Sequence, residues 1–409
     1  MPTLLQLNCT SNWGSAGKIA EQIGIKAIEV GWECYVAFGR YSNPSSLRNV
    51  RVGNNFWVLE HFVENRLWDN EGLASRISTK LFLKEIDKIH PDVVHLHNIH
   101  DHWLNYKILF EYLAAKQIPV VWTQHDQWAT TGHCMYTLDG CEKWKTGCKD
   151  CQMKRSDYPA SFIIRSERNW ILKKEAISSL PSLTVVSVSE WLADNIRQSH
   201  LKARPIKVIH NGIDINTFKP VECESINDER LTGRKILLAV ASVWSDAKGL
   251  NDYCKLSVML PEDYVIVLVG LTESQMSALP KGIIGLPRTQ NVMELVQLYS
   301  MARIVMSLSY SETFGLTVVE GMACGTPAIV YNNTAQKYLI DDKTGVAVET
   351  GDVAGVAEAV KTMDVRLAVN KEDISAACRQ RVVENFDKDK CFVKYIELYY
   401  KLLADKNRL

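Results

Sequence analysis

Residues 309–327 read SYSETFGLTVVEGMACGTP. An apolar run at 304–308 leads into this stretch, Gly315 predicts a turn, and the residues after the turn have the apolar spacing of a helix. Strand, turn and helix in this order are the repeating unit of a parallel sheet covered by helices. Ligands bind such sheets outside the carboxyl ends of the strands, so the stretch also predicts a binding site.

Two carboxylates indicate the chemistry of this predicted site. Glu312 precedes the turn, and Glu320 lies about two turns further on, within the helix. The backbone N–H groups at 314–317 would open the helix, where its positive end favours phosphate. Carboxylates beside a phosphate need another role, and sugar hydroxyls are natural donors to them. The combination indicates a nucleotide sugar as the ligand.

The same alternation of short apolar runs and longer helical patterns continues along the chain and predicts two doubly wound α/β domains. The expected strands are 3–7, 35–38, 92–97, 119–123, 183–187, 235–243, 264–270, 282–286, 304–308 and 326–330. The expected helices of the first half are 17–30, 103–115, 162–177 and 190–199. Turn residues at 203–205 and 211–214 place the domain boundary near residue 205.

The composition excludes several classes of protein. Of the 409 residues, 46% are hydrophobic and 23% charged, close to the average for soluble globular proteins. Lys plus Arg and Asp plus Glu both number 47, so no net basic field would attract nucleic acid. The start, MPTLLQLNC, lacks the pattern of a signal peptide, and no apolar run approaches the roughly 18 residues of a spanning helix. The odd number of cysteines, 11, favours reduced thiols and a cytoplasmic location.

Together with other motifs, residues 309–327 resemble a known family. The spacing of Glu312 and Glu320, with Phe-Gly-Leu between them and Ala-Cys-Gly-Thr-Pro after them, resembles the retaining glycosyltransferases of family 4. Members of that family have the GT-B fold, in which two Rossmann-like domains face each other across a cleft. The resemblance covers nearly the whole chain. Its further motifs are Gly14-Ser15-Ala16-Gly17-Lys18-Ile19, His95-Leu96-His97-Asn98, Thr123-Gln124-His125-Asp126, Val208-Ile209-His210-Asn211-Gly212-Ile213-Asp214, Lys248-Gly249 and Arg288-Thr289-Gln290-Asn291.

The resemblance implies roles for individual residues. Glu320 corresponds to the glutamate on the ribose hydroxyls, Glu312 to the one near the transferred sugar, and Lys248 to a basic residue on the diphosphate. His125 corresponds to a histidine of the first domain that faces the sugar. The other residues implied in donor binding are Phe314, Gly315, Leu316, Thr317, Arg288, Asn291, Gly14, Ser15, Ala16 and Gly17. No cofactor and no divalent metal on the diphosphate is implied for the chemistry.

The resemblance also suggests a division of labour between the domains. We expect an acceptor-side Rossmann-like domain at 1–204, which includes a Cys-rich loop at 125–160. A Rossmann-like domain that binds the nucleotide sugar is expected at 205–387. A helix at 388–409 is expected to pack back toward the first domain.

This chain departs from the family pattern in two places. Many relatives carry an arginine shortly before the lysine of the diphosphate site, but residues 240–248 contain none. The Pro-Glu that commonly follows the next strand is replaced by Thr334-Ala335-Gln336-Lys337-Tyr338. Lys337 is a candidate for the missing positive charge.

The Cys-rich loop has several interpretations. The pattern His133-Cys134-x6-Cys141-x6-Cys148-x2-Cys151 places four thiols within 18 residues. A Cys-x2-Cys pair is a frequent half of a tetrahedral zinc site, and a long loop needs a stabilising crosslink. Structural zinc on Cys134, Cys141, Cys148 and Cys151 is therefore one hypothesis. Free thiols and a redox pair are the alternatives.

Histidines and tryptophans of the first half also have two interpretations. A metal site is one for His97, His100 and His102, but a strand end followed by a loop gives no fixed ligand geometry. Helix capping and contacts with the acceptor are therefore favoured for these histidines. Core packing and sugar stacking compete for four tryptophans, and core packing is favoured for large apolar rings. They are Trp13, Trp103, Trp122 and Trp128.

Residues 162–174 mix basic and apolar side chains at helical spacing. A basic amphipathic helix can lie on an anionic membrane, and here Arg165, Arg168, Lys173 and Lys174 would contact it. The alternative is an ordinary helix whose Ile and Trp side chains face the core. This second interpretation is favoured.

These observations predict a retaining glycosyltransferase that moves a sugar from a nucleotide diphosphate donor to a glycan or lipid-linked glycan. Family members with these motifs commonly build bacterial surface polysaccharides, so the expected location is the cytoplasm, with peripheral contact at the inner membrane face. An epimerase of the same fold is one alternative, because fold alone does not decide function. A non-catalytic relative that binds sugar nucleotides is another, and the intact Glu312 and Glu320 argue against it.

Overall fold

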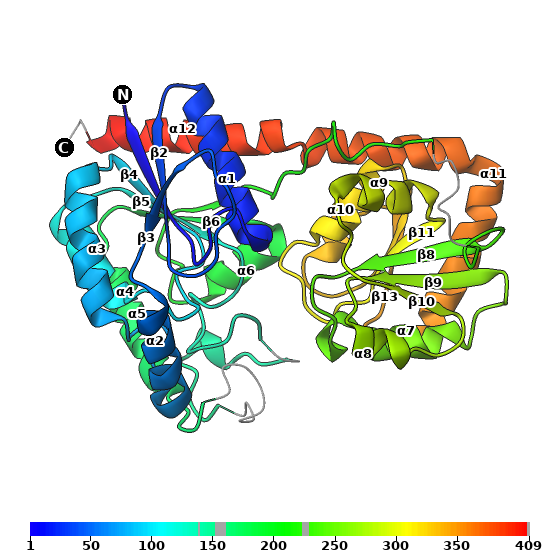
Figure 1. Ribbon diagram of the computed structural model, residues 1–409, viewed down its shortest axis with the longest axis horizontal. Coiled ribbons are helices and arrows are strands. Elements are labelled where there is room, and N and C mark those ends of the chain that lie inside the picture. Colours follow the sequence, from blue (N-terminus) through cyan, green and yellow to red (C-terminus); the bar gives the residue numbers. More distant parts are fainter. Residues whose placement is uncertain (138–139, 152–160, 223–228, 407–409) are drawn as a thin grey trace. The chain divides into compact units, whose positions relative to one another are not determined.

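Strand pairing divides the chain into two parallel sheets, one in each half (Figure 1). The computed structural model describes residues 1–137, 140–151, 161–222 and 229–406. Unit 1 comprises Met1–Ile209 and Phe392–Leu409, and unit 2 comprises His210–Cys391. Each unit contains its own sheet and helices, which confirms the prediction of two doubly wound, Rossmann-like domains.

The sheet of unit 1 has the strand order β3-β2-β1-β4-β5-β6-β7. Its strands are β1 Thr3–Leu7, β2 Glu33–Phe38, β3 Arg48–Arg51, β4 Val93–Leu96, β5 Val120–Gln124, β6 Leu183–Ser187 and β7 Ile206–Val208. Its helices are α1 Gly14–Glu29, α2 Asn55–Trp68, α3 Arg76–Ile89, α4 Tyr106–Ala115, α5 Ser166–Ser178 and α6 Glu190–Gln198, with the 3-10 turn η1 Lys143–Lys145. Every residue of β1, β4, β5 and β6 is buried, as in parallel sheets that are covered on both faces.

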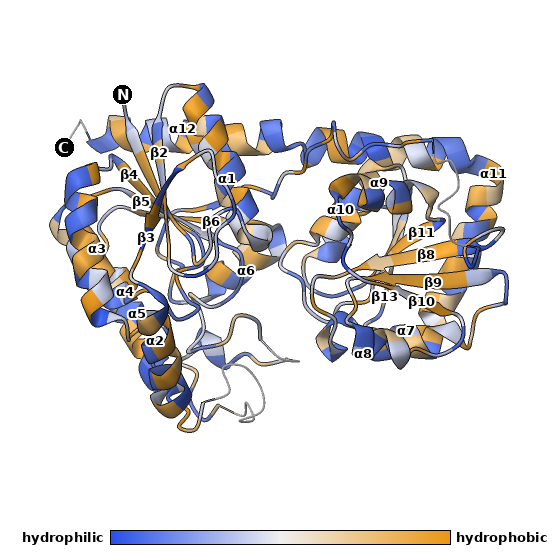
Figure 2. Cartoon of the chain, in the orientation of Figure 1, coloured by the Kyte–Doolittle hydropathy of each residue, from blue (hydrophilic) through white to orange (hydrophobic). Residues whose placement is uncertain are grey.

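The sheet of unit 2 has the strand order β10-β9-β8-β11-β12-β13. Its strands are β8 Lys235–Val240, β9 Tyr264–Val269, β10 Ile283–Leu286, β11 Ile304–Ser307, β12 Ala328–Tyr331 and β13 Gly345–Val348. Its helices are α7 Leu250–Ser257, α8 Glu273–Ser277, α9 Val292–Met301, α10 Leu316–Ala323 and α11 Val353–Asn385, with the 3-10 turns η2 Asp246–Lys248 and η3 Gln336–Tyr338. Figure 2 shows that the central strands of this unit are apolar, while the helices also carry hydrophilic residues.

Some elements were not predicted, for physical reasons. Strand β3 lies at the edge of its sheet and has no buried residue, so it shows no apolar run. Helix α2 exposes large apolar side chains such as Phe56 and Leu59, so its sequence lacks the one-sided pattern of a core helix. Helix α5 begins at Ser166, later than the expected start at 162.

The last helix, α12 Lys388–Lys406, joins the core of unit 1 through buried hydrogen bonds. Tyr399 Oη lies 2.6 Å from His95 Nδ1, and His95 Nε2 lies 2.7 Å from Thr123 Oγ1. Thr123 donates its hydroxyl hydrogen to Tyr395 over 3.1 Å. Thr123 must therefore accept from the N–H of His95, and His95 Nδ1 accepts from Tyr399. Burial lowers the pKa of His95 well below its usual range, in agreement with a neutral ring.

We predict that Tyr399→Phe destabilises unit 1. The change keeps the ring but leaves His95 Nδ1 in the core without a donor, which costs about 1–3 kcal/mol. Denaturant unfolding of the full chain measures the loss. Tyr400→Phe is the matched control, because the Tyr400 side chain is 46% exposed. Equal stability of the two variants would contradict the assigned hydrogen-bond chain.

Candidate active site

The candidate site of unit 2 lies where the order of its strands reverses. Strands β8 and β11 are neighbours in the sheet, and the chain winds outward from them in opposite directions. Lys248 follows β8 and Glu312 follows β11, so both lie at the carboxyl ends of these strands. Lys248 Nζ is 2.5 Å from Glu312 Oε1, with the two side chains 35% and 22% exposed. Such a switch point is where α/β sheets bind ligands.

Backbone geometry brings these two loops together. Gly249 follows Lys248 with φ 75°, a conformation that favours glycine. A Cβ atom at this position would collide with the carbonyl of Leu308, so only glycine permits the close approach. The N–H of Tyr310 donates to the carbonyl of Ala247 over 2.9 Å. The loop after β8 is thus held against the loop after β11.

The turn before α10 has the form that the sequence predicts. Gly315 has φ 105°, and α10 begins at the next residue, Leu316, followed by Thr317. Phe314 is buried, with its ring 6.0 Å from the ring of His210 and 5.7 Å from that of Phe386. Phe314 therefore anchors the turn, and its side chain is not available to a ligand. The first N–H groups of a helix have no partner within that helix, which makes this end suited to an anion.

Glu320 lies within α10 and has a partner that the sequence did not indicate. Its Oε2 accepts a hydrogen bond of 2.9 Å from the hydroxyl of Tyr299, which is fully buried in α9. Burial, together with the nearby Glu320 carboxylate, raises the pKa of Tyr299 well above its usual range. Tyr299 thus remains a donor and orients this carboxylate. A tyrosine within a helix carries no motif, so no sequence signal could have identified it.

Other predicted donor-binding residues of unit 2 lie on its surface. Arg288 is exposed in the loop after β10. Asn291 is the N-cap of α9, where its side chain accepts a 3.0 Å hydrogen bond from the N–H of Glu294. Its amide also donates to the carboxylate of Glu294 over 2.8 Å. Lys337 is half-buried in η3, with its Nζ 5.4 Å from the centre of the Tyr338 ring. The structure thus gives Asn291 a capping role.

In unit 1 the strand order reverses between β1 and β4. Helix α1 is the next element after β1 and begins at Gly14, so the predicted glycine turn lies at this switch point with Ser15, Ala16 and Gly17. Gly14 has φ 67°, and a Cβ atom on Gly17 would press against Thr10. The predicted backbone turn is therefore present at the carboxyl end of β1.

His125 lies at the same edge, directly after β5, and is in contact with His97 after β4. Its Nε2 is 2.9 Å from His97 Nδ1, and the two rings stack with centroids 5.2 Å apart. Burial lowers the pKa of His125 to about 4, although the Asp126 carboxylate opposes the shift. His125 is therefore neutral near pH 7.

Ion pairs surround these histidines. His100 Nε2 lies 2.8 Å from Asp126, and His102 Nε2 lies 3.1 Å from the buried Glu71. Burial alone would lower the pKa of His102, but Glu71 and Asp101 raise it to about 10. Neither the capping role nor the metal role considered for His100 and His102 describes these contacts. Glu71 lies in an unpatterned loop, which is why it was not predicted.

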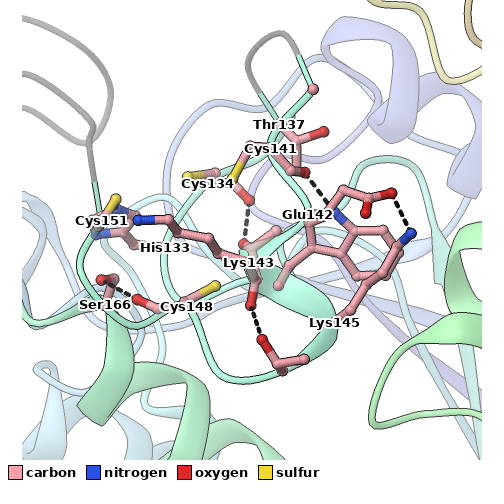
Figure 3. Close-up of a pocket in the computed structure, with 14 residues that line it drawn as sticks. His133, Cys134, Thr137, Cys141, Glu142, Lys143, Lys145, Cys148, Cys151 and Ser166 are labelled. Carbon is pink, nitrogen blue, oxygen red and sulfur yellow. Dashed lines mark hydrogen bonds and ion pairs between the residues drawn. The ribbon is translucent and has the colours of Figure 1, made fainter.

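The four cysteines of the predicted zinc site line one pocket of about 700 Å³ together with His133, as Figure 3 shows. His133 Nδ1 is 2.9 Å from the buried Asp69 carboxylate, and its Nε2 is 3.7 Å from Cys151 Sγ. A carboxylate that orients a histidine in this way is typical of metal sites. The N–H of Gly132 also donates to Cys148 Sγ over 3.1 Å.

The zinc hypothesis nevertheless stays a prediction. Within the described residues, no three His, Cys, Asp or Glu side chains are close enough together to hold a metal ion. No disulfide joins the cysteines that the structure describes. Residues 138–139 and 152–160 of the expected loop 125–160 lie outside the described residues. Metal content of the purified protein would decide between zinc and thiols.

The segment 162–174 differs from the basic amphipathic helix that was considered. Lys173 is buried, and its Nζ donates to the carbonyl of Trp128 over 2.6 Å. Arg168 donates to the carbonyl of Asp69 over 3.1 Å, and Trp170 is only 8% exposed. The interpretation in which all four basic side chains face a membrane is therefore wrong, because this segment packs on the core.

Three of the four tryptophans considered above are buried, as is usual for large apolar rings. Trp103, Trp122 and Trp128 are at most 2% exposed, whereas Trp13 is 44% exposed beside the glycine turn. The three buried rings are core residues and cannot stack on a sugar.

Among the described helices, none has both the length and the apolar character that crossing a membrane requires.

Comparison with known proteins agrees with this architecture. Residues 20–217 match the family model described as Glycosyltransferase Family 4, and residues 224–363 match the one described as Glycosyl transferases group 1. A putative colanic acid biosynthesis glycosyl transferase of Escherichia coli K12, WcaC, is 28% identical over 228 residues. That match covers 52% of this chain and 55% of WcaC, so the chain spans about half the length of this relative.

Solved structures match over nearly the whole chain. Sucrose-phosphate synthase from Thermosynechococcus elongatus has a TM-score of 0.70 and 17% identity, covering 99% of this chain and 100% of its own. Anabaena HepE, solved in complex with UDP-glucose, has a TM-score of 0.65 and 14% identity over 98% of this chain and 99% of its own. Identities this low show the fold alone. With two family models that together cover most of its residues, the chain belongs to the family 4 glycosyltransferases and has their GT-B fold.

Proposed function

We propose that this glycosyltransferase moves a sugar from a nucleoside diphosphate donor to a glycan or lipid-linked glycan, with retention of the anomeric configuration. The observation that carries the proposal is the Lys248–Glu312 pair beside the start of α10, at the switch point of unit 2. HepE, which has a similar fold, was solved with UDP-glucose. The name of WcaC refers to colanic acid biosynthesis, which supports a surface polysaccharide as the product.

The charges of unit 2 fit such a donor. Lys248 and the first amides of α10 are suited to a diphosphate, because a cation and a helix N-terminus both favour negative charge. Glu320, oriented by Tyr299, is suited to accept hydrogen bonds from ribose hydroxyls. Glu312 is paired with Lys248, so an arriving diphosphate competes for the ammonium group and releases this carboxylate toward the sugar.

In the mechanism that we propose, the acceptor hydroxyl attacks the anomeric carbon on the face from which the diphosphate departs. The bond from the anomeric carbon to the departing phosphate oxygen breaks as the new glycosidic bond forms, and that oxygen takes the acceptor proton. The protein holds the acceptor hydroxyl and the departing phosphate on the same face of the sugar and stabilises the charge that develops on the phosphate. Positioning and preorganised electrostatics are usually the largest contributions in such sites.

Contact with a membrane is a further part of the proposal, on a surface that the sequence did not indicate. Six apolar side chains of α2 are 36–66% exposed: Phe56, Leu59, Phe62, Val63, Leu67 and Trp68. Phe162 and Ile163 continue this α2 surface, and the N–H of Phe162 donates to the carbonyl of Arg66 over 2.7 Å. The Arg66 guanidinium lies 5.9 Å from the centre of the Phe62 ring. An apolar face that carries a basic side chain fits an anionic lipid surface.

We predict different defects for the two glutamates. Glu320→Ala should weaken donor binding, because the ribose loses its acceptor. Glu312→Ala should chiefly lower kcat, because its carboxylate acts near the transferred sugar. Calorimetric titration with donor and steady-state kinetics separate the two effects. Near-normal kinetics of both variants would remove unit 2 from the proposal, and donor turnover without any acceptor would favour the epimerase.

Lys248→Ala should lower turnover by about 10² to 10³, the scale for losing one preorganised group that stabilises developing charge. The change also leaves Glu312 without its partner beside the diphosphate. Lys281→Ala is the control, because the Lys281 side chain is 96% exposed. A rate that matches this control would mean that another cation, such as Lys337, holds the diphosphate.

The α2 surface should bind vesicles that contain anionic lipid. Replacing Phe56 and Leu59 by serine should reduce cosedimentation, because apolar area that would enter the interface is lost. Val365→Ser with Val369→Ser is the matched control, since these valines are 67% and 76% exposed on α11. Vesicle binding that the two changes on α2 leave intact would contradict this part of the proposal.

A further inference from the structure

Buried hydrogen bonds determine which nitrogen of His125 carries its hydrogen. The first link is Gln6 in β1, whose Nε2 donates to the carbonyl of Ala20 over 2.8 Å. Its Oε1 is thereby directed to His97 Nε2, at 3.0 Å. An amide oxygen can only accept, so His97 Nε2 must carry a hydrogen. The reverse orientation of the Gln6 amide would set its oxygen against the carbonyl of Ala20.

The second link is the ring of His97. Burial lowers the pKa of His97 well below its usual range, with smaller contributions from His95 and His125. The ring is therefore neutral, and because Nε2 carries the hydrogen, Nδ1 holds a lone pair. His97 Nδ1 lies 2.9 Å from His125 Nε2, so His125 Nε2 must be the donor of this hydrogen bond.

We propose that Gln6 and His97 are positioning residues that lock His125 in the tautomer with its hydrogen on Nε2. The lone pair of His125 then lies on Nδ1, and the ring acts as a hydrogen-bond acceptor. This inference rests on the proposed function and on the family resemblance, which implies that His125 faces the sugar. It implies that Nδ1 of His125 is a hydrogen-bond acceptor and that His125 does not supply a proton to the leaving group.

The residues that set this tautomer come from three neighbouring strands. Gln6 lies in β1, His97 follows β4 and His125 follows β5, and these strands are adjacent in the sheet of unit 1. Gln6 and His97 are at most 1% exposed, whereas His125 is half-buried. A buried chain of hydrogen bonds thus ends on a ring that is partly accessible. In this arrangement, buried residues can orient a reactive side chain through hydrogen bonds on its buried side.

The direct test is NMR spectroscopy of the full chain labelled with ¹⁵N-histidine. Long-range ¹H–¹⁵N spectra distinguish a protonated ring nitrogen from an unprotonated one, and His125→Gln and His97→Gln spectra assign the two rings. At pH 7 we expect hydrogen on Nε2 and none on Nδ1 in both. Hydrogen on His125 Nδ1 in the unmodified protein would overturn the proposal.

Gln6→Glu should reverse the direction of the hydrogen bond between His97 and His125. A carboxylate in this position favours a second hydrogen on His97, whose Nδ1 then donates to His125 Nε2 and drives the His125 hydrogen to Nδ1. We expect kcat to fall by about 10² or more, with KM for the donor nearly unchanged. A wrong histidine tautomer likewise lowers kcat in serine proteases. An unchanged His125 tautomer would show that Gln6 does not control it.

Two measurements keep this test separate from folding and from the proposed function. Should Gln6→Glu fail to fold, Gln6→Met, which leaves His97 Nε2 without an acceptor, should give a mixture of His125 tautomers. A single unchanged tautomer in Gln6→Met would also overturn the proposal. Donor binding by unit 2 should be normal in both variants. If the unmodified protein did not bind the donor, that result would instead contradict the proposed function, whatever the spectra show.

Discussion

Parallel strands all end at one edge of their sheet, and both candidate sites depend on this constraint. In unit 2 the order reverses between β8 and β11, and the loops after these strands bring Lys248 to within 2.5 Å of Glu312. In unit 1 the reversal between β1 and β4 gathers the glycine turn and two histidines. Gly249 allows the two loops of unit 2 to approach closely, and Gly315 adopts the positive φ of the turn that opens α10.

Much of this architecture could be predicted because local patterns in the sequence determine it. Strands β1 and β6 have the expected bounds, and the turn at Gly315 opens α10 as its sequence indicates. Contacts across the sheet were beyond prediction. Tyr299 donates to Glu320, and Gln6 accepts from His97. Neither Tyr299 nor Gln6 belongs to a recognisable motif, and only the fold gives them their partners. Helix α2 was missed because its apolar residues face outward.

Three histidines of unit 1 have partners that fix their charge. His95 and His97 are neutral within hydrogen-bond chains, whereas His102 is charged beside Glu71. Such networks are specific because a buried polar atom without a partner costs more than the bond itself contributes. The same logic explains why Lys173, buried against Trp128, belongs to the core and not to a membrane surface.

The central claim is that unit 2 holds a nucleoside diphosphate sugar between Lys248, Glu320 and the start of α10. Thermal unfolding of the full chain with uridine, guanosine and adenosine diphosphate sugars tests it most directly. A bound ligand at 100 times its dissociation constant adds about 2.7 kcal/mol of stability. The account predicts that one class of donor raises the melting temperature and that Glu320→Ala loses most of this increase. No increase with any of the three classes would contradict it.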